Sequence, residues 1–131
     1  MFGEQSIYGQ TMVHIDDKNR MFLPKITYVE KDDNLLILNK GDYIGIYSVE
    51  TFEETLKRLE KSFFGNDLQM KRELDLEILK LYSSILRKVK VDSQNRINFG
   101  NVELEDSEIL CIGAKDHIML KTKFKGIKKG K

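Results

Sequence analysis

Short apolar runs, each bounded by polar turn residues, occupy both ends of the chain. Runs of this length, continuous or alternating, predict β-strands. In residues 88–91 the two valines point one way and the two lysines the other, which predicts a strand with one buried face. The runs expected to form strands are residues 12–15, 36–41, 43–47, 88–91, 109–113 and 117–120.

The middle of the chain changes to helical spacing. Ser48 is a candidate N-cap, and Thr51 with Glu54 makes a second capping pattern. The apolar positions expected on one side of this helix are Phe52, Leu56, Leu59 and Phe63. Residues 65–67, Gly-Asn-Asp, break the helix.

A second helix is expected from about Leu68 to Leu86. Its apolar surface is broad, which predicts contact with both the sheet and another helix or subunit. The positions on its main stripe are Leu74, Ile78, Leu81 and Ile85. Both helices are expected to serve as core and as the link between the two ends of the chain.

Two nine-residue segments share one pattern, 76 residues apart. Residues 15–23 and 91–99 both read apolar, Asp, two variable residues, Asn, Arg, apolar, variable, apolar. A strand run, a glycine turn and another strand run follow each copy in the same order, so we interpret the match as a duplication. Because Asn adopts left-handed backbone more readily than any residue except Gly, we expect positive φ at Asn19 and Asn95.

These patterns predict an α+β fold of two tandem, pseudo-symmetric β-rich halves with helices between them. The expected parts are a first half (1–48), a helical segment (49–86), a second half (87–121) and a lysine-rich tail (122–131). No apolar stretch approaches the ~20 residues that span a bilayer, and the N-terminus lacks a signal core. We therefore expect a cytoplasmic protein without membrane contact.

The formal net charge of +1 hides an asymmetry. The last eleven residues hold six lysines and no acid, and the other 120 residues carry −5. Attraction to DNA must therefore come from local patches or from the tail, which we expect to be mobile. The single cysteine, Cys111, lies in an apolar run and is expected to be buried and inert.

Convergent reactive groups are scarce in this sequence. It contains no P-loop, no Gly-x-Gly-x-x-Gly and no serine elbow, and His14 and His117 are far apart. Asp16 and Asp17 resemble a carboxylate pair, but Asp16 recurs as Asp92 at the same distance from an arginine. This recurrence indicates turn geometry, in which Asp accepts backbone N–H bonds or pairs with its own Arg. We expect no enzyme activity, catalytic residue, metal, cofactor or small-molecule substrate.

The arginines of the two repeated segments suggest a more specific hypothesis, which is contact with DNA. A tight turn that presents Arg20, with Lys18 beside it and Lys25 just beyond, can reach DNA phosphates or base edges. The alternative is that Arg20 is held in a structural pair with Asp16. The residues alone leave both readings open.

Three segments resemble the MraZ family, which is related to the AbrB/SpoVT swapped-hairpin DNA binders. Residues 16–24 are similar to its Asp-x-Lys-Gly-Arg-(apolar)-x-(apolar)-Pro signature, and residues 92–100 resemble a second copy. Residues 112–118 are similar to the Ile-Gly-Gln-x-x-x-(apolar) segment of its second half, and the Met-Phe-Gly start also fits. The resemblance covers roughly residues 1–121.

The resemblance implies a function and a set of site residues. It implies a nucleoid-associated transcriptional regulator that binds double-stranded DNA, acting on its own operon or on the division and cell-wall gene cluster. It also implies AbrB-like halves and a ring-like homo-oligomer. Carried over by position, the DNA-contacting residues are Lys18 and Arg20 in the first copy and Arg96 in the second, and we add Lys25 from its place beyond the turn.

The chain departs from the family pattern at several positions. Asn replaces the signature Gly in both copies, Gln94 and Gly100 replace Lys and Pro in the second copy, and the usual final helix is missing. Two other functions stay open from the sequence. One is an AbrB-like antitoxin that represses its own operon, and the other is an oligomeric scaffold without DNA binding.

Overall fold

The computed structural model describes residues 6–62 and 68–129 and is an α+β fold with antiparallel strands. Its elements are β1 (Gln10–His14), β2 (Arg20–Phe22), the 3-10 helix η1 (Lys25–Thr27), β3 (Asn34–Asn39), β4 (Ile44–Ser48), α1 (Val49–Lys61), α2 (Leu68–Ser83), β5 (Ile85–Lys90), β6 (Arg96–Asn98), β7 (Val102–Leu104), β8 (Glu108–Gly113), β9 (His117–Leu120) and β10 (Phe124–Ile127). The expected chain start at 1–3, Phe63 and the helix break at 65–67 lie outside the described residues.

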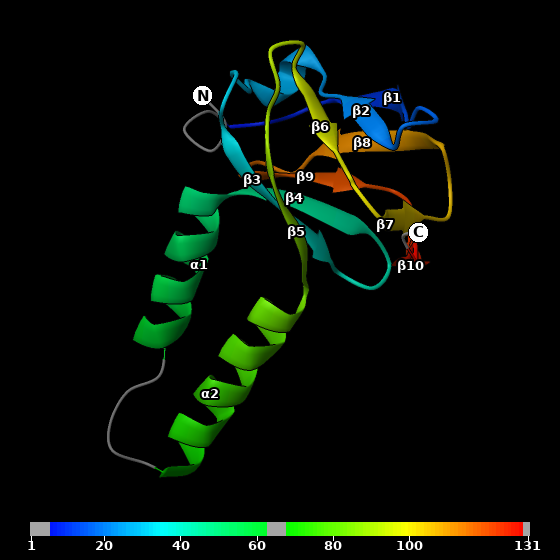
Figure 1. Ribbon diagram of the computed structural model, residues 1–131. Coiled ribbons are helices and arrows are strands. Elements are labelled where there is room, and N and C mark those ends of the chain that lie inside the picture. The colour runs from blue at the N-terminus through cyan, green and yellow to red at the C-terminus, as the bar shows by residue number, and fades with distance from the viewer. Residues whose placement is uncertain (1–5, 63–67, 130–131) are drawn as a thin grey trace.

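A six-stranded sheet in the order β1-β8-β9-β4-β3-β5 forms the centre of the molecule (Figure 1). β3 with β4 and β8 with β9 make two hairpins, which pair with each other through β4 and β9. The edge strands cross over, because β1 pairs with β8 and β5 pairs with β3. Each strand run predicted from the sequence overlaps one of these six strands.

A separate two-stranded ribbon, β2 with β6, covers one face of the sheet (Figure 1). Met21 and Ile97 lie opposite each other in this ribbon and are fully buried in the main apolar core. Val89 and Val91 reach the same core, while Lys88 and Lys90 are exposed, as the alternation predicts. The main core therefore lies between the sheet and the ribbon.

The helix pair covers part of the opposite face, over β3, β4 and β5. α1 begins at the predicted cap: the Ser48 hydroxyl accepts a hydrogen bond from the Thr51 N–H at 3.1 Å. Acidic Glu50 in the first turn and basic Arg58 in the last turn complement the helix dipole. A small second apolar cluster lies beneath the helices and contains Leu36, Leu38 and Phe52.

The second helix ends earlier than the sequence pattern predicts. α2 ends at Ser83, and the expectation of helix as far as Leu86 is wrong for Ile85 and Leu86, which begin β5. An apolar run of this kind fits either period. Here Ile85 packs against the cluster beneath the helices and Leu86 against the main core, which is the side-to-side alternation of a strand.

The lysine-rich end of the chain is partly built into the fold. Residues 124–127 form β10, which pairs with β7, and the Lys128 N–H donates to the Asn101 carbonyl at 2.6 Å. Phe124 and Leu104 pack against the main core. The expectation of a mobile tail is therefore wrong for residues 124–127, because one aromatic side chain anchors the strand.

Candidate nucleic-acid interface

The first Asp-x-x-Asn-Arg turn is closed by Asp16. Its Oδ1 accepts hydrogen bonds from the backbone N–H groups of Lys18, at 3.0 Å, and Arg20, at 2.8 Å. Its Oδ2 accepts a charge-assisted bond from Arg20 Nε at 3.0 Å. Asp16 therefore does both things that the sequence left open: it satisfies the turn backbone and it pairs with its own arginine.

The second turn repeats these bonds. Asp92 Oδ1 accepts from the backbone N–H groups of Gln94 and Arg96, both at 2.9 Å, and Asp92 Oδ2 accepts from Arg96 Nε at 2.9 Å. Asn19 and Asn95 both have positive φ, 61° and 56°, as predicted. The backbone carbonyl of Asn19 accepts a hydrogen bond from the N–H of Phe99, just after β6. The backbone carbonyl of Asn95 accepts one from the N–H of Leu23, just after β2.

These hydrogen bonds shift the acidity of both carboxyls. For Asp16, the bond from the Arg20 backbone contributes most, and with the bonds from the Arg20 side chain and the Lys18 backbone it outweighs desolvation and lowers the pKa. For Asp92, desolvation raises the pKa, but the bonds from Arg96 and Gln94 together outweigh it and the pKa is also lowered. Both turns are therefore built around an ionised carboxylate.

The β2–β6 register brings the two arginines to one surface. Arg20 lies opposite Asn98, and Phe22 lies opposite Arg96. Because alternate residues of a strand share a face, these four side chains lie on the side of the ribbon away from the core. Phe22 is 60% exposed on that side. We call the four residues the ribbon face.

Both arginines are restrained but keep free hydrogen-bonding capacity. Their side chains are 27% exposed for Arg20 and 20% for Arg96, and each uses Nε for its aspartate. Within residues 6–62 and 68–129, neither guanidinium makes a hydrogen bond through its terminal nitrogens. The Arg96 guanidinium also lies 5.7 Å from the Phe22 ring centroid, in cation–π geometry. Terminal nitrogens held in this way suit bidentate contact with guanine or phosphate.

The two predicted lysines lie beyond opposite ends of β2, because Lys18 precedes the strand whereas Lys25 follows Leu23, whose N–H donates to the Asn95 carbonyl of the second turn. Lys18 is exposed in the turn itself, and Lys25 is exposed at the start of η1. A shallow hollow beside the first turn is lined by Lys18 together with Lys125 and Lys128, and also by acidic residues, among them Glu103. The structure thus brings two lysines of the C-terminal strand region beside the first turn, an association that the sequence did not predict.

Sequence reasoning missed two members of the ribbon face. Phe22 sits between buried Met21 and Leu23, so the run looks uniformly apolar and hides an outward position. The signal was in the repeat, because the second copy places polar Asn98 where the first has Phe22. A position that is polar in one copy of a repeat is expected to face solvent in both.

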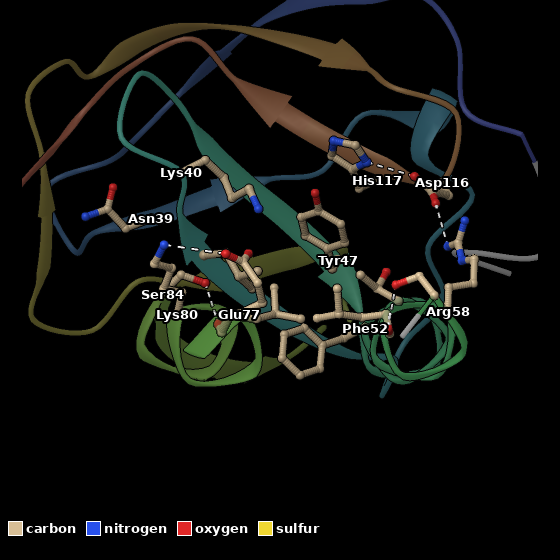
Figure 2. A pocket seen from close by; sticks show the side chains of 15 residues that line it. Asn39, Lys40, Tyr47, Phe52, Arg58, Glu77, Lys80, Ser84, Asp116 and His117 are labelled. Carbon is tan, nitrogen blue, oxygen red and sulfur yellow. Dashed lines mark hydrogen bonds and ion pairs between the residues drawn. The ribbon is translucent and has the colours of Figure 1, made fainter. Parts of the chain in front are cut away.

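A cleft of about 760 Å³ lies on the other side of the sheet, beneath the helix pair (Figure 2). Tyr47 of β4 and His117 of β9 stack on its wall, with centroids 4.4 Å apart and planes 5° from parallel. His117 Nδ1 lies 2.8 Å from Asp116, whose other oxygen is 3.8 Å from Arg58 of α1. This chain of contacts ties α1 to the sheet.

The chemistry of the cleft is limited by its tyrosine. Burial, together with the nearby Tyr43 and Asp116, raises the pKa of Tyr47 well above its usual range, so its hydroxyl is a weaker acid than that of an exposed tyrosine. Burial also raises the pKa of the Cys111 thiol to about 11, in keeping with the buried cysteine that we expect. None of the site residues predicted from the sequence lines the cleft.

The fold defines the class of this protein as α+β, with an antiparallel sheet, a helix pair on one face and a two-stranded ribbon on the other. No protein-family model matches the chain, and no curated protein matches it. In the part of the chain that the structure describes, no group of three or more His, Cys, Asp or Glu could hold a metal ion. Neither helix within these residues is long and apolar enough to cross a membrane.

Proposed function

We propose that this protein is a sequence-specific, DNA-binding transcriptional regulator of the MraZ type. The observation that carries the proposal is the ribbon face, where one two-stranded ribbon presents Arg20 and Arg96 on the same outward side. The major groove of B-DNA admits a two-stranded β-ribbon, and arginine is the commonest side chain for reading guanine there. In this proposal Arg20 and Arg96 contact bases, and Lys18 and Lys25 contact phosphates.

The second part of the proposal is that the chain consists of two tandem, pseudo-symmetric AbrB-like halves. Its support is the matched hydrogen bonding of the two turns and the order of the sheet. The sheet order β1-β8-β9-β4-β3-β5 is symmetric in the following sense. If β1 is exchanged with β5, β3 with β8 and β4 with β9, the same order is obtained when the sheet is read from its other edge. The two turns would then meet in the ribbon about one pseudo-twofold axis.

The remaining parts follow from the same resemblance. The protein acts as a ring-like homo-oligomer, without catalysis or cofactor, in the cytoplasm and on the nucleoid. Its targets are its own operon or the division and cell-wall gene cluster. A ring multiplies weak contacts, because several ribbons engage repeated DNA sites at once.

The test is binding to selected and to random duplex DNA at two salt concentrations. A preferred duplex is first selected from random sequences with the full chain. We expect Arg20→Ala to weaken binding to the selected duplex far more than binding to random duplex. Arg58→Ala, which removes an exposed arginine of α1 on the other side of the sheet, is the matched control and should bind normally.

Three outcomes would overturn the proposal or change it. If no duplex is bound at low salt, the oligomeric scaffold replaces the regulator. If Arg20→Ala and Arg58→Ala bind equally well, the ribbon face is not the interface. If Arg20→Ala melts well below the unaltered protein, Arg20 serves Asp16 and the turn rather than DNA.

A further inference from the structure

Phe22 is the apolar member of the ribbon face, whose other members are Arg20, Arg96 and Asn98. It is 60% exposed, whereas Met21 and Leu23 on either side of it are buried in the main core. Figure 1 shows the β2–β6 ribbon on the far side of the sheet from α1 and α2, so the helices do not cover the ribbon face. A single exposed apolar residue is common on protein surfaces, so its neighbours decide what it can contact.

The neighbours of Phe22 combine apolar and cationic groups. Phe22 lines a second shallow hollow together with Met12, Pro24 and Arg20, and Met12 is 58% exposed. The Arg96 guanidinium lies 5.7 Å from the Phe22 ring centroid. Each arginine is fixed through its Nε by its own aspartate, at 3.0 Å for Arg20 and 2.9 Å for Arg96. An apolar surface beside two fixed cations suits a ligand that carries hydrogen-bond acceptors and an apolar group close together.

The major groove of duplex DNA presents such a combination. Guanine presents O6 and N7, which arginine contacts, and thymine presents its C5 methyl group, which apolar side chains contact. Arg96 lies directly opposite Phe22 in the ribbon, so their Cα atoms are about 5 Å apart. Arg20 lies two residues before Phe22 on the same strand, about 6.6 Å away. Base pairs follow one another every ~3.4 Å, so the three side chains can reach base pairs that are neighbours or next neighbours.

The other arm of the ribbon lacks the apolar group. The repeat puts exposed Asn98 in the place of Phe22 and exposed Lys88 in the place of Met12. Asn98 Oδ1 accepts a hydrogen bond from the Gly100 N–H at 2.7 Å, so the amide presents its N–H donors to base acceptors. An amide donor gains nothing from a methyl group, so the two arms favour different bases.

We infer that Phe22 is a specificity-determining residue that packs against the C5 methyl group of a thymine in duplex DNA. This thymine lies next to the guanine that Arg96 contacts, and the equivalent position beside Arg20, where Asn98 lies, does not depend on a methyl group. The two halves of the DNA site are therefore unlike, and the protein binds the site in one direction although its ribbon is pseudo-symmetric. The inference rests on the proposed function, because it assigns a base to a ribbon that reads DNA.

Removing the methyl group from the DNA tests the contact directly. A duplex is selected from random sequences with the full chain, and each thymine is replaced in turn by deoxyuridine, which still pairs with adenine and lacks only the methyl group. At one position the unaltered protein should bind roughly fourfold more weakly, which is the usual effect of one buried methyl group. Phe22→Ala should bind the thymine and deoxyuridine duplexes equally well. Because both proteins meet the same two duplexes, the comparison separates the methyl contact from any effect of deoxyuridine on duplex shape.

Two further variants sharpen the test. Leu79→Ala is the matched control, because it shortens an exposed apolar side chain of α2 on the other side of the sheet and should keep the fourfold difference. Phe22→Asn makes the two arms alike, so a new selection with this variant should lose the thymine position and give a more nearly palindromic site. Thermal melting verifies that each variant is folded, as expected for substitutions at exposed positions.

The inference fails if the selected duplex lacks thymine, if no thymine is sensitive to the loss of its methyl group, or if Phe22→Ala keeps the same sensitivity. In each of these cases the protein still binds a preferred duplex, so the proposed function survives. A chain that binds no duplex at low salt overturns the proposed function together with this inference.

Discussion

The two arginines of the ribbon face differ in what lies beside them. The guanidinium of Arg96 is held over the Phe22 ring, whereas Arg20 lies opposite the small polar Asn98. Arg20 also has Lys18 next to it in the turn, where the second turn has Gln94. The first turn therefore has one more basic side chain than the second, although Asp17 in the place of Ser93 gives both turns the same formal net charge, and the arginine of the first turn is the less restrained of the two.

We predict that Arg20→Ala weakens binding to a selected duplex more than Arg96→Ala does. The expected loss for Arg20→Ala is about 1–3 kcal/mol of binding free energy, which is usual for an arginine that reads a base. Neither substitution should unfold the protein, because partly exposed ion pairs contribute about 0–1 kcal/mol to stability. Titration of both variants on one duplex measures this, with thermal melting as the control. An equal or larger loss for Arg96→Ala would contradict it.

The two turn aspartates predict a dependence of stability on pH. Because the folded-state pKa of Asp16 and Asp92 is lowered below 3.8, their contribution to stability is fully present above about pH 4 and is lost as the pH falls through the folded-state values. In Asp16→Asn/Asp92→Asn this contribution is absent at every pH. When the pH is lowered from 5 through the folded-state pKa values of these aspartates, the Tm of the variant should therefore fall less than the Tm of the unaltered protein.

The measurement is a series of thermal melts across that range, each compared with the same variant's Tm at pH 7. Asp42→Asn, at an exposed turn position, is the matched control and should follow the unaltered protein. Parallel curves for the double variant and the unaltered protein would show that the turn carboxylates are not responsible for the acid sensitivity.

At the scale of elements, β10 changes the view of the lysine-rich end. Pairing with β7 brings Lys125 and Lys128 to the hollow beside the first turn. Deleting this segment would remove a strand, so its role in DNA binding is better tested by substitution. The lysine side chains are exposed, whereas Phe124 supplies the packing.

We predict that Lys125→Ala/Lys128→Ala weakens binding to selected and to random duplex by the same factor. Lysines on phosphates do not read sequence, and the log–log salt dependence should flatten by about 0.9 for each phosphate that is no longer neutralised. Lys31→Ala/Lys57→Ala removes the same charge from two exposed positions elsewhere and serves as the control. If the ratio of selected to random affinity changes instead, these lysines contact bases.

At the scale of the whole molecule, the two ends of the chain share one core. Met21 of β2 and Ile97 of β6 are opposed in the ribbon and buried in the same cluster. Each edge strand of the sheet also pairs with a hairpin from the other end of the chain. A substitution that destabilises one end of the chain should therefore destabilise the other end as well.

We predict that Ile97→Ala lowers the free energy of unfolding by about 2–5 kcal/mol and keeps a single transition. Amide exchange should rise in β2 as well as in β6, because the ribbon and its core are shared. Urea unfolding and hydrogen exchange measure this, and Ile127→Ala, at a 53% exposed position of β10, is the control. Two separate transitions, or exchange confined to β6, would contradict it.

Local signals predicted much of this fold. Ser48 caps its helix, Asn19 and Asn95 adopt positive φ, and Val89 and Val91 face the core, as local patterns predicted. Each of these outcomes depends only on a residue and its neighbours in the sequence. The start of β5 was not predictable, since Ile85 and Leu86 fit a helix or a strand equally well.

Features that depend on distant partners were missed. β7 and β10 are too short to show a period, and one includes a glycine. The crossed pairing of β1 with β8 has no local signature at all, because hydrophobic pattern specifies a face and not a neighbour. The four-residue ribbon face followed only from the pairing of β2 with β6, so the sequence indicated Arg20 and Arg96 but not Phe22 and Asn98.

The crossed pairing has a consequence for synthesis on the ribosome. β1 is translated well before its partner strand β8, which begins only at Glu108. At ~5–20 residues per second, the roughly one hundred residues between them take about 5–20 s to translate. During this interval the first hairpin has neither of its neighbours for part of the time, and β1 has none. The nascent chain therefore carries open strand edges until β8 and β9 have been translated, and chaperones that shield such edges should matter more for its yield than for its final stability.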